Sequence, residues 1–140
     1  MKYKAFIYDI IVKRLFRGIY MNKLESKEDY LERILILHKS NDIVRGIDLA
    51  NSFKYSKASV SIALKKLKNL RYINVDLADG NIILTKKGRV IAEEIYERHT
   101  ILTNVLVKIG VPEDIAQEDA CKIEHEISKE TLEALKKVSQ

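Results

Sequence analysis

Hydrophobic residues in the first half of the chain recur with the period of a helix in three successive segments. A first helix is predicted from the N-cap Ser26 to about Lys39, because apolar side chains return every three to four residues after Tyr30. A short helix from Ile47 to Phe53 and a longer helix from Ser56 to about Leu70 follow. The side chains expected to face inward are Ile47, Leu49, Ala50 and Phe53 in the short helix, and Val60, Ile62, Ala63, Leu64 and Leu67 in the longer one.

Two short runs of alternating apolar and polar residues come next and predict β-strands. They cover residues 72–77 and 81–85, and Ala78-Asp79-Gly80 between them is typical of a hairpin turn. Helix, short helix, turn, helix and hairpin is the element order of a winged helix-turn-helix. The sequence therefore predicts a mainly α protein with a small β-hairpin wing.

The remaining third of the chain is predicted to be helical. A long helix from about Lys86 to Ile109 ends at Gly110-Val111-Pro112, because glycine caps a helix and proline cannot continue it. Two more helices are expected, over 112–125 and over 128–138, the latter with Ser128 as its N-cap.

Charge is segregated along the 140 residues, whose net charge is +5. No acid occurs from Leu49 to Val75, a stretch that carries six basic residues. From Glu113 to Glu133 the balance reverses, with eight acids against two lysines. A basic middle is typical of a surface that meets a polyanion, and an acidic end of one that holds cations.

Composition excludes some classes of protein. The hydrophobic share of 46% and the charged share of 32% argue against a disordered chain. The single cysteine, Cys121, cannot form an internal disulfide, which suits a cytoplasmic protein. No uninterrupted apolar run reaches the ~18 residues of a membrane span, so no membrane partner is expected.

The predicted third helix carries small hydroxyls and lysines on its non-core surface. Such side chains can enter a major groove about 12 Å wide, and the lysines can neutralise phosphates. The alternative is an ordinary solvated helix, but solubility alone does not require so long an acid-free stretch. The candidate DNA-binding residues are Ser56, Lys57, Ser59, Ser61, Lys65 and Lys66.

Candidate metal ligands occur in three places. Asp29 and Glu32 are three residues apart, so both carboxylates share one helical face. The pattern Cys121-x-x-Glu124-His125 places a thiol, a carboxylate and an imidazole on another face, and a further imidazole, His99, lies midway along the long helix. These donors suit divalent transition metals. Each fragment alone is also compatible with solvated acids and a structural histidine or cysteine.

With these motifs the chain resembles the diphtheria-toxin-repressor and manganese-transport-regulator (DtxR/MntR) family of metal-dependent repressors. The resemblance covers about Ser26 to Ser139. The most specific stretches are Glu28-Asp29-Tyr30-Leu31-Glu32, Leu84-Thr85-x-x-Gly88, Arg98-His99-x-x-Leu102 and Glu118-Asp119-Ala120-Cys121-x-x-Glu124-His125-x-Ile127-Ser128.

The resemblance implies a winged helix-turn-helix DNA-binding domain over 26–90 and a helical metal-binding and dimerisation domain over 91–140, after an N-terminal extension over 1–25. It also implies a homodimer that binds operator DNA and represses metal-uptake genes, with Fe(II) or Mn(II) as co-repressor. The positions that match the family's metal ligands are Asp29, Glu32, His99, Cys121, Glu124 and His125.

Three departures from the family pattern affect the expected metal. Asp29 and Glu32 resemble the manganese-type arrangement, whereas Cys121 resembles the iron-type one. Thr103 and Gln117 stand where iron-type members carry ancillary ligands. Thiolate softness favours iron and the acid pair favours manganese, so both metals stay open, with a preference for iron.

Without metal, the four anionic donors are expected to repel one another, leaving the first helix loosely attached or some acids protonated. Two rival functions remain: a winged-helix regulator without metal control, and a metallohydrolase or thiol enzyme. The absence of a glycine-rich loop or nucleophile elbow argues against an enzyme.

Overall fold

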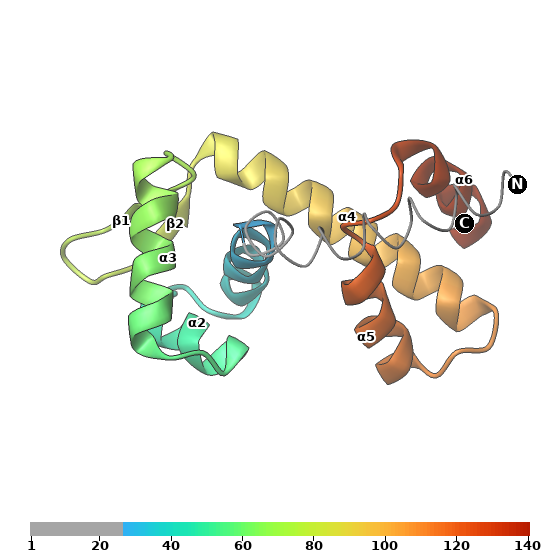
Figure 1. Ribbon diagram of the computed structural model, residues 1–140, viewed down its shortest axis with the longest axis horizontal. Coiled ribbons are helices and arrows are strands. Elements are labelled where there is room, and N and C mark those ends of the chain that lie inside the picture. Colours follow the sequence, from blue (N-terminus) through green and yellow to red (C-terminus); the bar gives the residue numbers. More distant parts are fainter. Residues whose placement is uncertain (1–26) are drawn as a thin grey trace, which may run out of the picture.

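The computed structural model describes residues 27–140, which form two groups of elements joined by one long helix (Figure 1). Ser26, the predicted first N-cap, and the extension over 1–25 lie outside the described residues. The first described helix covers residues 27–40. The elements that follow are α2 (Gly46–Phe53), α3 (Lys57–Asn69), β1 (Ile73–Val75), β2 (Ile82–Leu84), α4 (Lys86–Lys108), α5 (Glu113–Ile123) and α6 (Lys129–Ser139).

The 27–40 helix forms the centre of the first group. Its inner face buries Leu31 and Ile34 completely, and these side chains pack in one cluster with residues of α2, α3 and the hairpin. Leu49 and Val60 supply the apolar faces of α2 and α3. The result is a helix-turn-helix whose α3 is held against the core along one side only.

Two expectations about inward-facing residues are wrong. Ile62 is 72% exposed, because it lies two residues, or about 200°, around the helix from the buried Val60. Ile47 is exposed as well, although Leu49 and Ala50 of the same helix are buried as expected. Hydrophobicity alone therefore overestimated the width of the inner face on both helices.

The hairpin is antiparallel, with Ile73 paired to Leu84 and Val75 to Ile82. Its strands are shorter than predicted, because Asp76 and Asp79 accept hydrogen bonds from backbone N–H groups of the turn. The Val44 backbone lies beside the second strand, and its carbonyl accepts a 2.7 Å hydrogen bond from the Ile82 N–H. This pairing fixes the wing to the helix-turn-helix.

Thr85 and Gly88 make the joint between the wing and α4. The Thr85 hydroxyl caps α4 by accepting from the Gly88 N–H at 3.1 Å, and it donates to the Arg71 carbonyl at 2.7 Å. A Cβ placed on Gly88 would lie 2.1 Å from the Tyr72 carbonyl oxygen. The Leu84-Thr85-x-x-Gly88 stretch thus lets α4 start directly against the backbone that precedes β1.

Gly88→Ala is expected to destabilise the fold, because the added methyl group forces α4 away from the Tyr72 backbone. Overpacking of this kind costs about 1–3 kcal/mol or more. Urea unfolding followed by circular dichroism measures the loss. Gly46→Ala is the control: its Cβ meets only the end of the flexible Leu64 side chain at 3.4 Å, so its stability should stay close to that of the parent.

The second group of elements is built on the C-terminal half of α4, where α5 and α6 pack. Ile101, Leu102 and Val105 of α4 are buried, together with Ala116 and Ala120 of α5. The small alanine side chains allow α5 to approach α4 closely. Among residues 27–140, no helix is both long and apolar enough to cross a membrane.

The turn between α5 and α6 is attached to α4 by Arg98. Its guanidinium donates to the backbone carbonyls of Glu124 and Ile127, at 3.3 and 3.0 Å. Helix α5 ends at Ile123, so it is shorter than predicted, and His125 lies just beyond it. Arg98 therefore fixes the position of the segment that carries two candidate ligands.

Candidate metal centre and nucleic-acid interface

All six predicted metal ligands come from three segments that meet at one place. Asp29 and Glu32 extend from the 27–40 helix, and His99 from the middle of α4. Cys121 lies near the end of α5, with Glu124 and His125 directly after it. The meeting point lies between the two groups of elements, where α5 approaches the 27–40 helix (Figure 1).

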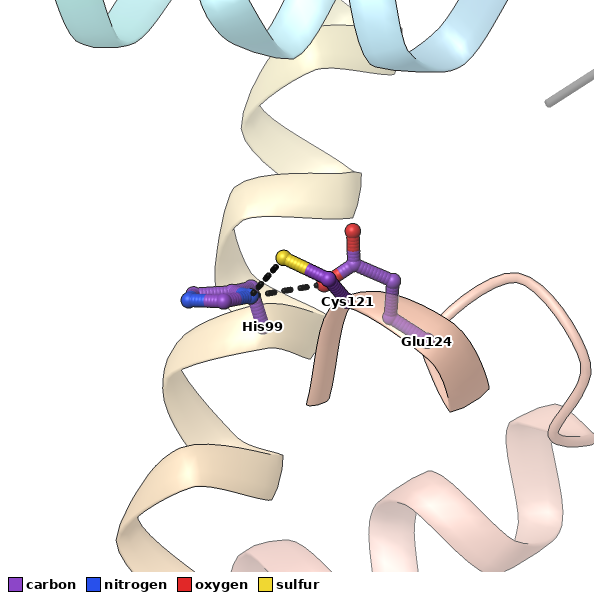
Figure 2. A group of neighbouring side chains, drawn as sticks. All are labelled: His99, Cys121 and Glu124. Atoms are coloured by element: carbon purple, nitrogen blue, oxygen red, sulfur yellow. Dashed lines mark hydrogen bonds and ion pairs between the residues drawn. The ribbon is translucent and has the colours of Figure 1, made fainter. Parts of the chain in front are cut away.

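His99, Cys121 and Glu124 form the first cluster (Figure 2). The His99 Nδ1 atom lies 2.8 Å from Glu124 Oε2 and 3.6 Å from Cys121 Sγ. One donor atom from each residue lies within 4.8 Å of the other two. A single ion could be held by all three.

Asp29, Glu124 and His125 form the second cluster, again with one donor atom of each within 4.8 Å of the others. The His125 Nε2 atom lies 2.9 Å from Asp29 Oδ1 and 3.4 Å from Glu124 Oε1. Glu124 belongs to both clusters, through different oxygens, and its side chain is 1% exposed. It is therefore the common member of the site.

Glu28 contacts His125 in the site, although it was not among the residues predicted from the sequence. Its Oε2 atom lies 2.7 Å from Nδ1 of His125, the nitrogen opposite the one that faces Asp29. A carboxylate at the second ring nitrogen orients an imidazole and raises its basicity as a ligand. The spacing of Glu28 and Glu32, one turn apart, was a sequence signal for this acid, but it did not identify the partner.

The pKa values in the site depart from ordinary ones because the groups are crowded and partly buried. Burial and the neighbouring Glu124 carboxylate raise the pKa of Glu32 to about 7, with a hydrogen bond between the two carboxyls. Hydrogen bonds with Cys121 and Glu124 raise the pKa of His99 to about 10. Burial lowers the pKa of His125, but hydrogen bonds with Asp29 and Glu28 outweigh it and raise the value to about 10.

The metal-free protein should lose stability as the pH rises. Unfolded, the histidines release their protons near pH 6.5 and Glu32 near 4.5, whereas in the fold they do so near 10 and 7. A group whose pKa is higher in the folded than in the unfolded protein stabilises the fold fully below its unfolded pKa. This stabilisation is lost as the pH rises through the folded pKa. Melting temperatures in chelator should therefore fall from about pH 6 to pH 10.

The control for this pH dependence is the protein saturated with Mn(II). Its donors have already lost their protons, so metal stabilisation should grow with pH and metal uptake should release protons. A melting temperature in chelator that stayed flat over this range would contradict the assignment of protons to His99 and His125.

The donor set fits a divalent transition metal. Carboxylates, imidazoles and one thiol are the groups that Mn(II), Fe(II) and Zn(II) take from proteins. Thr103 and Gln117, which stand at the family's ancillary-ligand positions, are not in either cluster. Within residues 27–140, Thr103 Oγ1 is buried without a hydrogen-bond partner, and the Gln117 amide donates to Glu113 Oε1 at 3.5 Å. Five of the six predicted ligands thus fall in the two clusters, and Glu32 joins them only through its contact with Glu124.

The six candidate DNA-binding residues lie on α3 and at its start, and all are exposed. The Ser56 hydroxyl accepts from the Ser59 N–H at 3.1 Å, so Ser56 is the N-cap of the helix. A hydrogen bond also joins the hydroxyls of Ser56 and Ser59, at 2.9 Å. These two serines therefore organise the first turn of α3, whereas Lys57, Lys65 and Lys66 are exposed on its surface.

Two family models match the chain, one in each half. Residues 23–79 match the family described as iron dependent repressor, N-terminal DNA binding domain. Residues 85–140 match the one described as iron dependent repressor, metal binding and dimerisation domain. Together the two matches cover most of the chain.

Curated relatives cover most of the chain as well. An HTH-type transcriptional regulator of Methanocaldococcus jannaschii is 40% identical, over 80% of this chain and 90% of its own length. The transcriptional regulator MntR of Escherichia coli is 34% identical, over 85% of this chain and 76% of its own.

Solved structures share the fold. A manganese-dependent transcriptional repressor in complex with manganese matches with a TM-score of 0.74 and 26% identity, over 81% of this chain and 52% of that one. IdeR of T. acidophilum matches with a TM-score of 0.69 and 26% identity, over 79% and 52%. The chain thus spans about half the length of these structures. It belongs to the iron-dependent repressor (DtxR/MntR) family, whose members are metal-dependent, DNA-binding transcriptional repressors and not enzymes.

Proposed function

We propose that this protein is a cytoplasmic homodimer that binds operator DNA when Fe(II) or Mn(II) is bound, and so represses genes for metal uptake. We assign the metal to Asp29, Glu32, His99, Cys121, Glu124 and His125. We assign DNA contact to Ser56, Lys57, Ser59, Ser61, Lys65 and Lys66.

The observation that carries this proposal is the position of Glu124. Its two oxygens contact His99 of α4 and His125 after α5, and its carboxyl group also contacts Glu32 of the 27–40 helix. One buried carboxylate thus joins three segments that are far apart in the sequence. A cation bound here supplies positive charge where these anionic side chains meet.

The chain's own residues explain how such a site controls DNA binding. Once His99, His125 and Glu32 have lost their protons, as metal binding requires, the carboxylates of Asp29, Glu32 and Glu124 repel one another unless a cation lies between them. This repulsion weakens the attachment of the 27–40 helix to α4 and α5. That helix is the centre of the DNA-binding core, so its attachment sets where α3 lies relative to the second group of elements. Two α3 helices in a dimer must be about 34–36 Å apart, or a multiple of it, to reach successive half-sites.

The test is anaerobic retardation of an upstream DNA fragment by the protein in chelator, Fe(II), Mn(II) or Zn(II). Coupling energies of about 1–3 kcal/mol between two sites correspond to a roughly 5- to 150-fold gain in affinity on metal addition. Equal affinity in chelator and in metal would support a regulator without metal control and would overturn the proposal.

Cys121→Glu is expected to shift metal preference toward manganese. A carboxylate is a harder ligand than a thiolate, so Fe(II) and Zn(II) should lose affinity relative to Mn(II). Competition titrations with a fluorescent chelator give the ratio of the affinities. Because Cys121 is exposed at the surface of α5, the longer side chain can be accommodated without repacking the core. An unchanged ratio would remove Cys121 from the ligand set.

A further inference from the structure

Ile62 is a large apolar side chain on a surface of α3 that consists mostly of serine and lysine residues. It is 72% exposed on α3, while Val60 and Leu67 of the same helix are buried at 1% and 3%. A helix gains nothing in stability from an isoleucine that remains in water, since burial is what makes this side chain favourable. The exposure of Ile62 therefore indicates that its side chain contacts another molecule.

Ile62 also lies at the centre of the candidate DNA-binding face. The residues three and four positions away are its neighbours on the helix surface. These neighbours are Ala58, Ser59, Lys65 and Lys66, and all four are exposed. The isoleucine is thus surrounded by two of the assigned lysines and one of the assigned serines.

We infer that Ile62 reads the 5-methyl group of a thymine in the major groove. The inference rests on the proposed DNA-binding function and names the base edge that α3 selects. Thymine is the one base with a methyl group on its major-groove edge, whereas the other bases are distinguished there by their hydrogen-bonding atoms. An isoleucine placed against those polar edges would leave them without partners, which costs free energy.

The charge around Ile62 favours DNA over a second copy of this chain as the occupant. Lys65 and Lys66 flank the side chain, and no acid occurs from Leu49 to Val75. Two such faces would repel each other, whereas the phosphates on either side of a major groove attract them.

The test uses the full chain with Mn(II) and a duplex selected from a random-sequence library. Each thymine of the selected site is replaced in turn by uracil, which removes the methyl group and leaves base pairing unchanged. At one or two positions, uracil should weaken binding about fourfold, the effect of burying one methyl-sized group. In Ile62→Ser this ratio should fall to about one, and in Ile62→Val most of it should remain.

Two further variants separate methyl recognition from general binding. Lys65→Ala should weaken binding to all duplexes and reduce its salt dependence, with the uracil ratio retained. Val90→Ser removes a branched apolar side chain that is 60% exposed on α4, and it should leave both the affinity and the ratio unchanged.

The outcomes distinguish a failure of this inference from a failure of the proposed DNA-binding function on which it rests. If no duplex is retained in the presence of metal, the proposed function fails. If duplexes bind but uracil has no effect anywhere, or Ile62→Ser keeps the ratio, the inference about Ile62 is overturned and the function stands. A changed dimer mass in Ile62→Ser, with the ratio intact, would overturn it in favour of a contact between copies.

Discussion

Glu124→Gln is expected to lower the affinity for Mn(II) and Fe(II) by roughly 100-fold or more and to abolish metal-dependent DNA retardation. Loss of an outer partner of a metal ligand alone costs about 10- to 100-fold, and Glu124 contributes directly to both clusters. Glutamine has nearly the same shape but offers one neutral oxygen where the parent offers two charged ones. Isothermal titration under anaerobic conditions measures the loss.

Glu118→Gln is the matched control, since it makes the same chemical change on the exposed side of α5. Its metal affinity and DNA retardation should equal those of the parent. Circular dichroism should show that both variants are folded. If Glu124→Gln bound Mn(II) as tightly as the control, Glu124 would not be a ligand, and the metal site would have to be sought elsewhere.

Replacing Lys57, Lys65 and Lys66 together with alanine is expected to remove most of the affinity for DNA. Each lysine that neutralises a phosphate contributes about 0.9 to the slope of log affinity against log salt. The slope should therefore decrease by up to about 2.7 for each protomer. All three side chains are exposed on α3, so stability should change little.

The control is a triple variant that also removes three positive charges, but from the acidic half of the chain. It combines Lys122→Ala, Lys129→Ala and Lys137→Ala. These lysines are also exposed, but they lie on α5 and α6. Binding assays from low to high salt should give the parent slope for this variant. Equal losses in the two triple variants would show that net charge, and not the surface of α3, decides affinity.

The order and approximate bounds of the elements could be predicted from the sequence because local signals set them. Ser56 and Ser128 cap α3 and α6 as expected, through bonds to the N–H groups three residues on. Thr85 caps α4 in the same way. Errors arose where a local pattern competed with packing, as at Ile62 and Ile47, whose hydrophobicity suggested burial that the helix geometry does not allow.

The candidate site could be predicted residue by residue but not in its connectivity. Spacing along a helix indicated that Asp29 could lie beside Glu32, and Glu124 beside Cys121. It could not indicate that Glu124 lies between two imidazoles, or that Glu28 contacts His125, because these contacts depend on how α5 packs against the 27–40 helix. Which acid occupies the centre is a property of the tertiary structure.

Helix α4 belongs to both halves of the protein, and its stiffness has a mechanical consequence. It contains 23 residues and has no proline, and its single glycine, Gly88, lies in the first turn. Between His99 and Lys86 the helix is about 20 Å long, at ~1.5 Å per residue. A tilt of about 5° at His99 would displace the far end by about 1.7 Å over that length. The helix therefore acts as a lever arm, which converts a small angular adjustment into a translation at the wing.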